Sequence, residues 1–342
     1  MKILLIGGTG TISMAITRQL SREGHELYLL NRGSRSREVP ENVRTISVDI
    51  RDEAAAARAL EGMRFDVVGE FIGFTPDQVE RDYRLFAGKC GQYIYISSAS
   101  AYQKPLSDCR ITESTPLCNP YWEYSRNKIA CEEFLMRMYR ENGFPVTIVR
   151  PSHTYDERSV PLGIHGRNGS WQVIRRMQQG KPVLIQGDGT SLWTMTHNSD
   201  FAKGYIGLMG NLHAIGEAYQ ITGDETLTWN QIYQAIARAL EVPFRPYYVP
   251  SDFLAAVSDY DLRGSLTGDK ANSVIFDNSK LKRAVPGFCA TVRFDQGVKA
   301  TIDHVLAHPE LQREDPEFDA WCDRVIEAME QAKRSLLGAA KA

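Results

Sequence analysis

The sequence predicts an α/β fold in which helices cover both faces of a parallel sheet. Three observations carry this prediction: an apolar run opens the chain, further short apolar runs follow it, and helical periodicity lies between most of them. A parallel strand that is covered on both faces is apolar along its length. Strands that alternate with helices form right-handed βαβ units, which build a doubly wound sheet.

The elements follow in order along the first half of the chain. In the first predicted helix, 12–22, Ile12, Ile16 and Leu20 recur every four residues and share one face, and Gly24 ends the helix. Further helices are predicted at 52–60 and 77–87. The predicted strands are 3–6, 27–30, 44–48, one that begins at 66–68, 92–96 and 146–149.

The composition excludes several classes of protein. The 342 residues carry 40 Lys+Arg against 42 Asp+Glu, a net charge of -2, with 43% hydrophobic residues. This balance is typical of a soluble globular chain and offers no basic footprint for nucleic acid or a membrane surface. Six cysteines without a CxxC pair indicate neither a disulfide framework nor a zinc site, and a reduced, cytoplasmic setting is expected. The histidines His153, His165 and His197 share no metal-ligand spacing, so no metal is expected.

A glycine-rich turn joins the first strand to the first helix. Glycines permit a tight turn there and let backbone N–H groups approach a pyrophosphate at a helix N-terminus, as in Rossmann-type dinucleotide sites. The spacing is GxxGxxG with Ser13 at the third position, which weakens the pattern, and a turn without a ligand is the alternative. The residues predicted to contact the cofactor here are Gly7, Thr9, Gly10, Thr11 and Ile12.

The end of the second strand bears on the choice between NAD and NADP. An acidic residue there would bind the ribose 2′-hydroxyl of NAD, but this chain has Asn31 and Arg32, with Arg35 following. Arginine suits the 2′-phosphate, so NAD or NADP is expected with NADP favoured. The alternative is that both arginines are solvated loop charges.

A tyrosine and a lysine are placed for catalysis. Tyr124 and Lys128 lie at i and i+4 of a predicted helix, and Ser98 follows the fifth strand, where open α/β sheets bind ligands. With these elements in this order, the chain resembles the extended short-chain dehydrogenase/reductases, the NAD-dependent epimerase/dehydratase group. The further matching segments are Asp49-Ile50, Arg150-Pro151 and 196–202.

The resemblance implies roles for these residues. Tyr124 would be the acid/base and, with Lys128, would contact the cofactor. Lys128 would lower the pKa of Tyr124 and bind the nicotinamide ribose, and Ser98, aided by Ser100, would hold the reacting oxygen. Asp49 would accept from the adenine amino group, although it could instead cap the next helix. The resemblance also places Ile50, Phe71 and Pro151 along the cofactor and implies a homodimer formed through two helices of each subunit.

The chain pattern and the resemblance together predict the division into domains. A Rossmann domain is expected at 1–155, with a return to it around 196–225 that includes a strand at 218–222. A smaller C-terminal α/β substrate lobe is expected from 156 to 342, with the substrate cleft between the two. The lobe would contain a helix at 171–178 and an amphipathic helix that carries Phe318 to Met329 and packs on its own domain.

The substrate is less well specified. Positions that bind a diphosphate in nucleotide-sugar enzymes hold His153 and Trp193 here, and an indole cannot pair with a diphosphate as a guanidinium can. A sugar or sugar-like alcohol or ketone is therefore expected, and a nucleotide sugar is left open. Epimerisation, dehydration and net redox change are open as well. His153 and Trp193 are the candidate substrate-binding residues of these segments. The arginines that could replace the missing charge are Arg158, Arg167, Arg175 and Arg176.

A second hypothesis is a non-catalytic, RNA-binding or regulatory protein that keeps the cofactor as a structural ligand. The Gly-Gly-Thr opening and the segment Thr196 to Asp200 are similar to the chloroplast stem-loop-binding branch of the group. The complete set of Ser98, Tyr124 and Lys128, together with the slightly acidic charge balance, favours the enzyme.

Overall fold

The computed structural model describes residues 1–33 and 39–339 and divides the chain into two compact units. Unit 1 comprises Met1–Asp156, Thr194–Thr226 and Val274–Val292, and unit 2 comprises Glu157–Trp193, Leu227–Ser273 and the chain from Arg293 onward. The chain thus enters unit 1 three times. The third passage, 274–292, has no counterpart among the sequence-based expectations.

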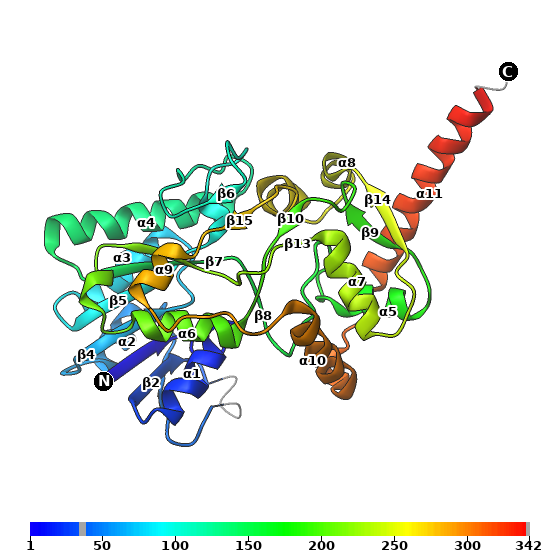
Figure 1. The fold of residues 1–342 in the computed structure, drawn as a ribbon. Coiled ribbons are helices and arrows are strands. Elements are labelled where there is room, and N and C mark those ends of the chain that lie inside the picture. Colours follow the sequence, from blue (N-terminus) through cyan, green and yellow to red (C-terminus); the bar gives the residue numbers. More distant parts are fainter. Residues whose placement is uncertain (34–38, 340–342) are drawn as a thin grey trace. The chain divides into compact units, whose positions relative to one another are not determined.

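Unit 1 is built on a seven-stranded sheet in which every pairing is parallel (Figure 1). Its strand order is β12-β7-β5-β4-β1-β2-β3, so the chain winds outward from β1 in both directions. The doubly wound parallel sheet predicted from the sequence is confirmed, including the returning edge strand. The strands are β1 (Lys2–Ile6), β2 (Glu26–Asn31), β3 (Arg44–Ser47), β4 (Phe65–Glu70), β5 (Cys90–Ile96), β7 (Val146–Pro151) and β12 (Ala218–Ile221).

Helices cover both faces of this sheet, with a separate apolar core on each side. On one side, Ile16 and Leu20 of α1 (Ser13–Arg22) and Phe201 of α6 (Asn198–Leu208) pack against odd-numbered residues of β1 such as Leu5. On the other, α2 (Glu53–Ala59), α3 (Pro76–Phe86) and α4 (Glu123–Asn142) pack against even-numbered ones such as Leu4. Alternate side chains of a strand point to opposite faces, which is why one apolar run serves both cores.

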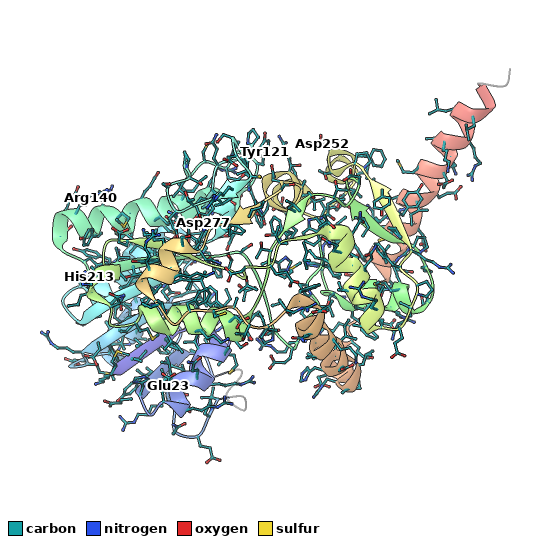
Figure 2. The ribbon with its side chains drawn as sticks, viewed as in Figure 1. Glu23, Tyr121, Arg140, His213, Asp252 and Asp277 are labelled. Atoms are coloured by element: carbon teal, nitrogen blue, oxygen red, sulfur yellow. The ribbon has the colours of Figure 1, made fainter. Side chains whose placement is uncertain are left out.

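Short elements complete unit 1. Two pairs of short parallel strands, β8 with β11 and β6 with β15, join segments that are distant in sequence. Asp277, labelled in Figure 2, directly follows β15. The remaining elements are η2 (Ala99–Ala101), β6 (Arg110–Ile111), β8 (His153–Tyr155), β11 (Met195–His197), η3 (Leu212–Ala214), β15 (Ile275–Phe276) and α9 (Ser279–Ala284).

Unit 2 combines helices with two small sheets, one parallel (β9 with β14) and one antiparallel (β10 with β13). The predicted terminal helix exists and packs within this unit through Phe318, Trp321, Cys322 and Val325, all buried. Its elements are α5 (Trp171–Gln178), β9 (Val183–Gln186), β10 (Leu192–Trp193), β13 (Leu227–Thr228), α7 (Trp229–Ala239), β14 (Pro246–Val249), α8 (Ser251–Ala256), the π-helix η4 (Arg263–Lys270), α10 (Phe294–Ala307), η5 (Pro309–Leu311) and α11 (Pro316–Ala339). No helix of the described residues is long and apolar enough to cross a membrane.

Candidate active site

The loop between β1 and α1 has the shape of a ligand cradle. Gly7 has a φ of +85°, and a Cβ on it would lie 2.5 Å from Ile72 Cγ2. A Cβ on Gly8 would lie 2.5 Å from Leu29 Cδ2. A side chain at Gly7 would be strained by the positive φ and would meet Ile72, and one at Gly8 would have to displace Leu29 in the core. Gly7 and Gly10 line the cavities at the carboxyl edge of the sheet.

Ser13, which replaces the third glycine of the pattern, holds this loop closed. Its hydroxyl donates to the Gly7 carbonyl oxygen at 2.8 Å and accepts from the Gly10 amide at 2.9 Å. One helix turn later, the Thr17 hydroxyl donates to the Gly8 carbonyl at 2.7 Å. The departure from glycine thus brings two hydrogen bonds that a glycine lacks.

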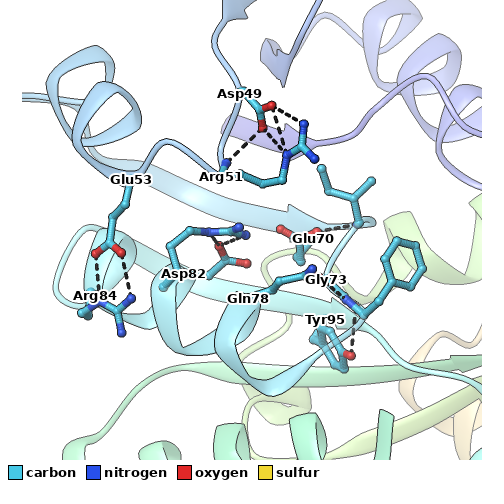
Figure 3. A network of polar contacts seen from close by, with 12 residues as sticks. Asp49, Arg51, Glu53, Glu70, Gly73, Gln78, Asp82, Arg84 and Tyr95 are labelled. Atoms are coloured by element: carbon cyan, nitrogen blue, oxygen red, sulfur yellow. Dashed lines mark hydrogen bonds and ion pairs between the residues drawn. The ribbon is translucent and has the colours of Figure 1, made fainter. Parts of the chain in front are cut away.

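A cavity of ≈ 480 Å³ lies beside the loop, where the resemblance places the adenosine half of a dinucleotide. Arg51 forms a forked ion pair with Asp49, with Nη2 to Oδ2 at 2.6 Å, and these hydrogen bonds lower the pKa of Asp49 to about 2 (Figure 3). Arg35 lies outside the described residues. The lining residues are Gly7, Thr9, Gly10, Leu30, Asn31, Arg32, Val48, Asp49, Ile50, Arg51, Ile72, Phe74, Gln78 and Arg81.

The alternative role considered for Asp49, capping the following helix, is wrong. Helix α2 begins after Asp52, whose side chain accepts from the Ala55 amide at 3.0 Å. The sequence contains two aspartates three residues apart, and the second is the N-cap. Asp49 therefore lines the cavity with its carboxylate already paired to Arg51.

A second cavity of unit 1, of ≈ 430 Å³, brings the predicted catalytic residues together. Ser98, Tyr124 and Lys128 line it with the glycine loop. The residues Phe71, Pro151 and His153, also predicted from the sequence, line it too. Its full lining is Gly7, Gly10, Thr11, Ile12, Ser13, Phe71, Ile72, Phe74, Ile96, Ser97, Ser98, Tyr124, Lys128, Pro151, Ser152, His153 and Thr154.

The Lys128 side chain is buried and strongly held. Its Nζ donates to the carbonyl oxygens of Gly73 and Ile96, both at 2.7 Å. An ammonium group has three N–H donors, so one remains after these two bonds. Burial lowers the pKa of Lys128 to about 8, because desolvation disfavours the charged form. The Nζ lies 5.8 Å from the centre of the Tyr124 ring.

Tyr124 lies one helical turn before Lys128 and is partly exposed. Its ring packs against Trp122, with centroids 4.9 Å apart, and against Phe74 at 6.5 Å. Phe74 is itself 46% exposed and lines both cavities. The segment that carries Phe71 and Phe74 was expected from the sequence to form a bulky apolar wall beside the cofactor, and both side chains line a cavity here.

Behind Ser98 is a chain of hydroxyl groups. Ser98 Oγ and Ser100 Oγ are 2.9 Å apart, and Ser125 donates to Ser100 at 2.8 Å. Asn119 fixes the turn by donating to the Ser100 carbonyl oxygen at 2.8 Å. Ser100 is buried and lines neither cavity, so its contact is with Ser98; its direct contact with substrate stays a prediction.

Trp193 belongs to unit 2, where it is 3% exposed and stacks on Trp229 with ring centroids 5.6 Å apart. Its role in substrate binding stays a prediction. Two of the arginines considered as substitutes for a diphosphate site are bound by acidic partners: Arg175 pairs with Glu314, and Arg176 with Asp319 and Asp323. Among the described residues no group of three or more metal-ligating side chains is arranged to hold an ion.

Fold and site together define a dinucleotide-binding α/β protein with a serine, a tyrosine and a lysine at one cavity. The model of the NAD dependent epimerase/dehydratase family matches residues 3–222, and the chain belongs to this family. It is 24% identical over 289 residues to 2′-dehydrokanamycin reductase of Streptomyces kanamyceticus, covering 84% of this chain and 80% of that one. It is 26% identical over 269 residues to the chloroplast stem-loop binding protein of 41 kDa b of Arabidopsis thaliana, covering 74% and 67%.

Solved structures show the same fold at low identity. An epimerase from Methanothermobacter thermautotrophicus superposes with a TM-score of 0.74 at 18% identity, over 91% of this chain and 94% of that one. The dTDP-glucose 4,6-dehydratase of Bacillus anthracis, solved in complex with NAD, superposes with a TM-score of 0.70 at 18% identity, over 91% and 98%.

Proposed function

We propose that the protein is an NAD(P)-dependent oxidoreductase that reduces a ketone on a sugar-like substrate, with NADP(H) preferred. The observation that carries this proposal is the shared cavity of Ser98, Tyr124 and Lys128 beside the glycine loop. The likeness to 2′-dehydrokanamycin reductase supports the choice of a reduction as the reaction.

The residues present fit a dinucleotide. The backbone at Gly7 and Gly10, which lines the cavity without side chains, would admit a pyrophosphate. Ile50 and Phe74 offer apolar surface in the same cavity. Arg32 lines the same cavity and would hold a 2′-phosphate, while the remaining N–H of Lys128 would bind a ribose hydroxyl. When bound, the cofactor supplies the hydride.

Side chains of the protein would supply the proton and position the carbonyl oxygen of the substrate. Tyr124 would give its phenolic proton to the carbonyl oxygen as the alcohol forms, and the Lys128 ammonium would stabilise the resulting phenolate by its opposite charge. Ser98 would donate a hydrogen bond to the same oxygen and so hold it beside Tyr124.

Replacing Tyr124 by Phe tests this proposal. Turnover should fall at least about 100-fold, since a general acid contributes 10²–10⁴. NADPH affinity should stay within about twofold, because the cradle is untouched. Oxidation of NADPH is followed by absorbance with keto-glycosides, free ketosugars and oxidised nucleotide sugars. The matched control is Tyr121→Phe, three residues earlier, which should behave as the wild type.

Three outcomes would change the conclusion. Full turnover in Tyr124→Phe would contradict the assigned acid. Conversion of a sugar to its epimer without net NADPH consumption would make the reaction an epimerisation. A protein that turns over none of the panel but binds a stem-loop RNA would favour the non-catalytic alternative, for which the likeness to the chloroplast protein is the supporting observation.

A further inference from the structure

An acidic side chain at the end of β4 is completely buried. Glu70 has no exposed surface, and its Oε1 accepts a hydrogen bond from the Ile72 amide at 2.5 Å (Figure 3). Its other oxygen, Oε2, is buried without a hydrogen-bond partner among the described residues. A buried, unsatisfied carboxylate oxygen is costly, so its protonation state needs an explanation.

The neighbour of Glu70 is a second carboxyl group. Asp82 of α3 receives hydrogen bonds from the Arg81 guanidinium at 2.7 and 2.9 Å and from the Tyr93 hydroxyl at 2.8 Å. These donors stabilise Asp82 as the charged partner. Burial, and then the negative charge of Asp82, raise the pKa of Glu70 well above its ordinary value. Two adjacent buried carboxyl groups avoid like-charge repulsion when one of them keeps its proton.

A protonated Glu70 accounts for the orphan oxygen. A neutral carboxylic acid has one O–H donor and one carbonyl acceptor. The carbonyl oxygen accepts from the Ile72 amide, and the hydroxyl can donate to the Asp82 carboxylate, which has acceptor capacity left. Both oxygens then have a partner, which they lack when Glu70 is ionised.

Residues 71–74, which directly follow Glu70, form part of the wall of both cavities and contact Lys128. Ile72 and Phe74 line both cavities. Between them, the Gly73 carbonyl oxygen accepts from Lys128 Nζ at 2.7 Å and from the Tyr95 hydroxyl at 3.1 Å. The segment is thus fixed at one end by the Glu70 carboxyl and at the other by the lysine ammonium.

We propose that Glu70 is a positioning residue: as a neutral acid hydrogen-bonded to Asp82, it fixes residues 71–74 and, through the Gly73 carbonyl, the ammonium of Lys128. The function of Lys128 rests on the proposed oxidoreductase activity, but the position of its ammonium does not. Ionisation of Glu70 would place two negative charges together in the core and displace the wall. The charged or titratable groups that act on Glu70 or respond to it are Asp82 and Arg81 of α3, Tyr93 of β5, Lys128 of α4 and Tyr205 of α6.

Two substitutions separate the proposed role from simple packing. In Glu70→Gln the amide keeps one acceptor and gains a donor that cannot ionise, so NADPH affinity at pH 7 should stay within about twofold. In Glu70→Leu both hydrogen bonds are lost, and affinity should fall at least about fivefold. The matched control, Glu53→Gln, removes an exposed carboxylate that pairs with Arg84 and should change nothing.

The readouts do not depend on turnover. NADPH binding is measured by fluorescence, the pKa of Lys128 by NMR with labelled lysine, and folding by circular dichroism. The Lys128 pKa should stay near its wild-type value in Glu70→Gln and move in Glu70→Leu. Infrared difference spectra of wild type against Glu70→Gln should show the C=O stretch of a protonated carboxyl at neutral pH. Above neutral pH, wild-type affinity should fall more steeply than that of Glu70→Gln.

The proposal is overturned if the protonated-carboxyl band is absent, or if Glu70→Leu lowers the melting temperature but leaves the Lys128 pKa unchanged. If Glu70→Leu does not fold, the infrared band and the pH dependence of Glu70→Gln decide. Full activity of Tyr124→Phe alongside the expected Glu70 results would refute the proposed function and leave this inference standing.

Discussion

The Ser100 amide donates to the Ser98 hydroxyl oxygen at 3.1 Å, while the two hydroxyl oxygens lie 2.9 Å apart. Ser125 donates to Ser100 at 2.8 Å, and either hydroxyl of the Ser98–Ser100 pair can donate to the other. When Ser100 is the donor, the Ser98 oxygen accepts twice and its own proton is left for the cavity. Helix α4 therefore orients the serine that is to hold the reacting oxygen.

The first prediction concerns this chain of hydroxyls. Replacing Ser125 by Ala should lower kcat up to about tenfold. The hydroxyl chain from Ser125 through Ser100 would then no longer orient the proton of Ser98. NADPH affinity should not change. The comparison is Ser98→Ala, whose loss should be larger. Equal turnover in the wild type and in Ser125→Ala would refute a role of this hydroxyl chain in orienting Ser98.

The second prediction concerns the glycine loop. Ser13→Ala removes both hydrogen bonds that close the loop and should lower the free energy of unfolding by about 1–2 kcal/mol. Ser13→Gly restores the sequence pattern but should cost more, since glycine disfavours the helix by about a further 1 kcal/mol. Urea unfolding measures both, with the exposed Ser47→Ala as a control. A stabilised Ser13→Gly would contradict the proposed role.

The third prediction concerns cofactor choice. Arg32→Ala should weaken NADPH binding about tenfold or more and leave NADH binding unchanged, because only NADPH carries the 2′-phosphate that a guanidinium would bind. Fluorescence titration of both nucleotides measures the effect. Arg64→Ala, an exposed arginine that lines neither cavity, is the control. Wild-type preference for NADH would show that Arg32 is a solvated loop charge.

The fourth prediction is a pH dependence of stability. The pKa of Lys128 falls from 10.5 to about 8 on folding, so between these values the unfolded chain binds more protons and stability rises with pH. Relative to Lys128→Met, the wild type should gain up to about 3 kcal/mol of unfolding free energy from pH 8 to pH 10.5. Urea unfolding of both proteins at the two pH values gives this difference. A constant difference would mean that Lys128 titrates normally.

Local patterns were sufficient to predict the framework of the site. The alternation that places Leu4 and Leu5 on opposite faces predicted a covered parallel strand, and the i, i+4 spacing put Tyr124 and Lys128 on one side of a helix. Each of these inferences needs residues close in sequence and one known period.

What the sequence could not reveal depends on partners distant along the chain. Glu70 resembles an ordinary polar residue at a strand end, and its burial becomes visible only with Asp82 folded over it. Strand β15 has two residues, too few to show a period, so the third passage through unit 1 was missed. Arg51 gave no signal because its ion pair with Asp49 depends on how the loop turns after β3.

Helix α4 carries Tyr124 and Ser125 on one turn, Lys128 on the next and Glu132 on the one after. Glu132 anchors the helix to Arg150 of β7 through a buried ion pair of 2.6 Å. Each residue of a helix adds about 100° of rotation. Inserting or deleting a single residue between Ser125 and Glu132 would therefore turn either the acid or the anchor away from its partner. This stretch can change its composition but not its length, so engineered insertions belong in the loops that flank α4.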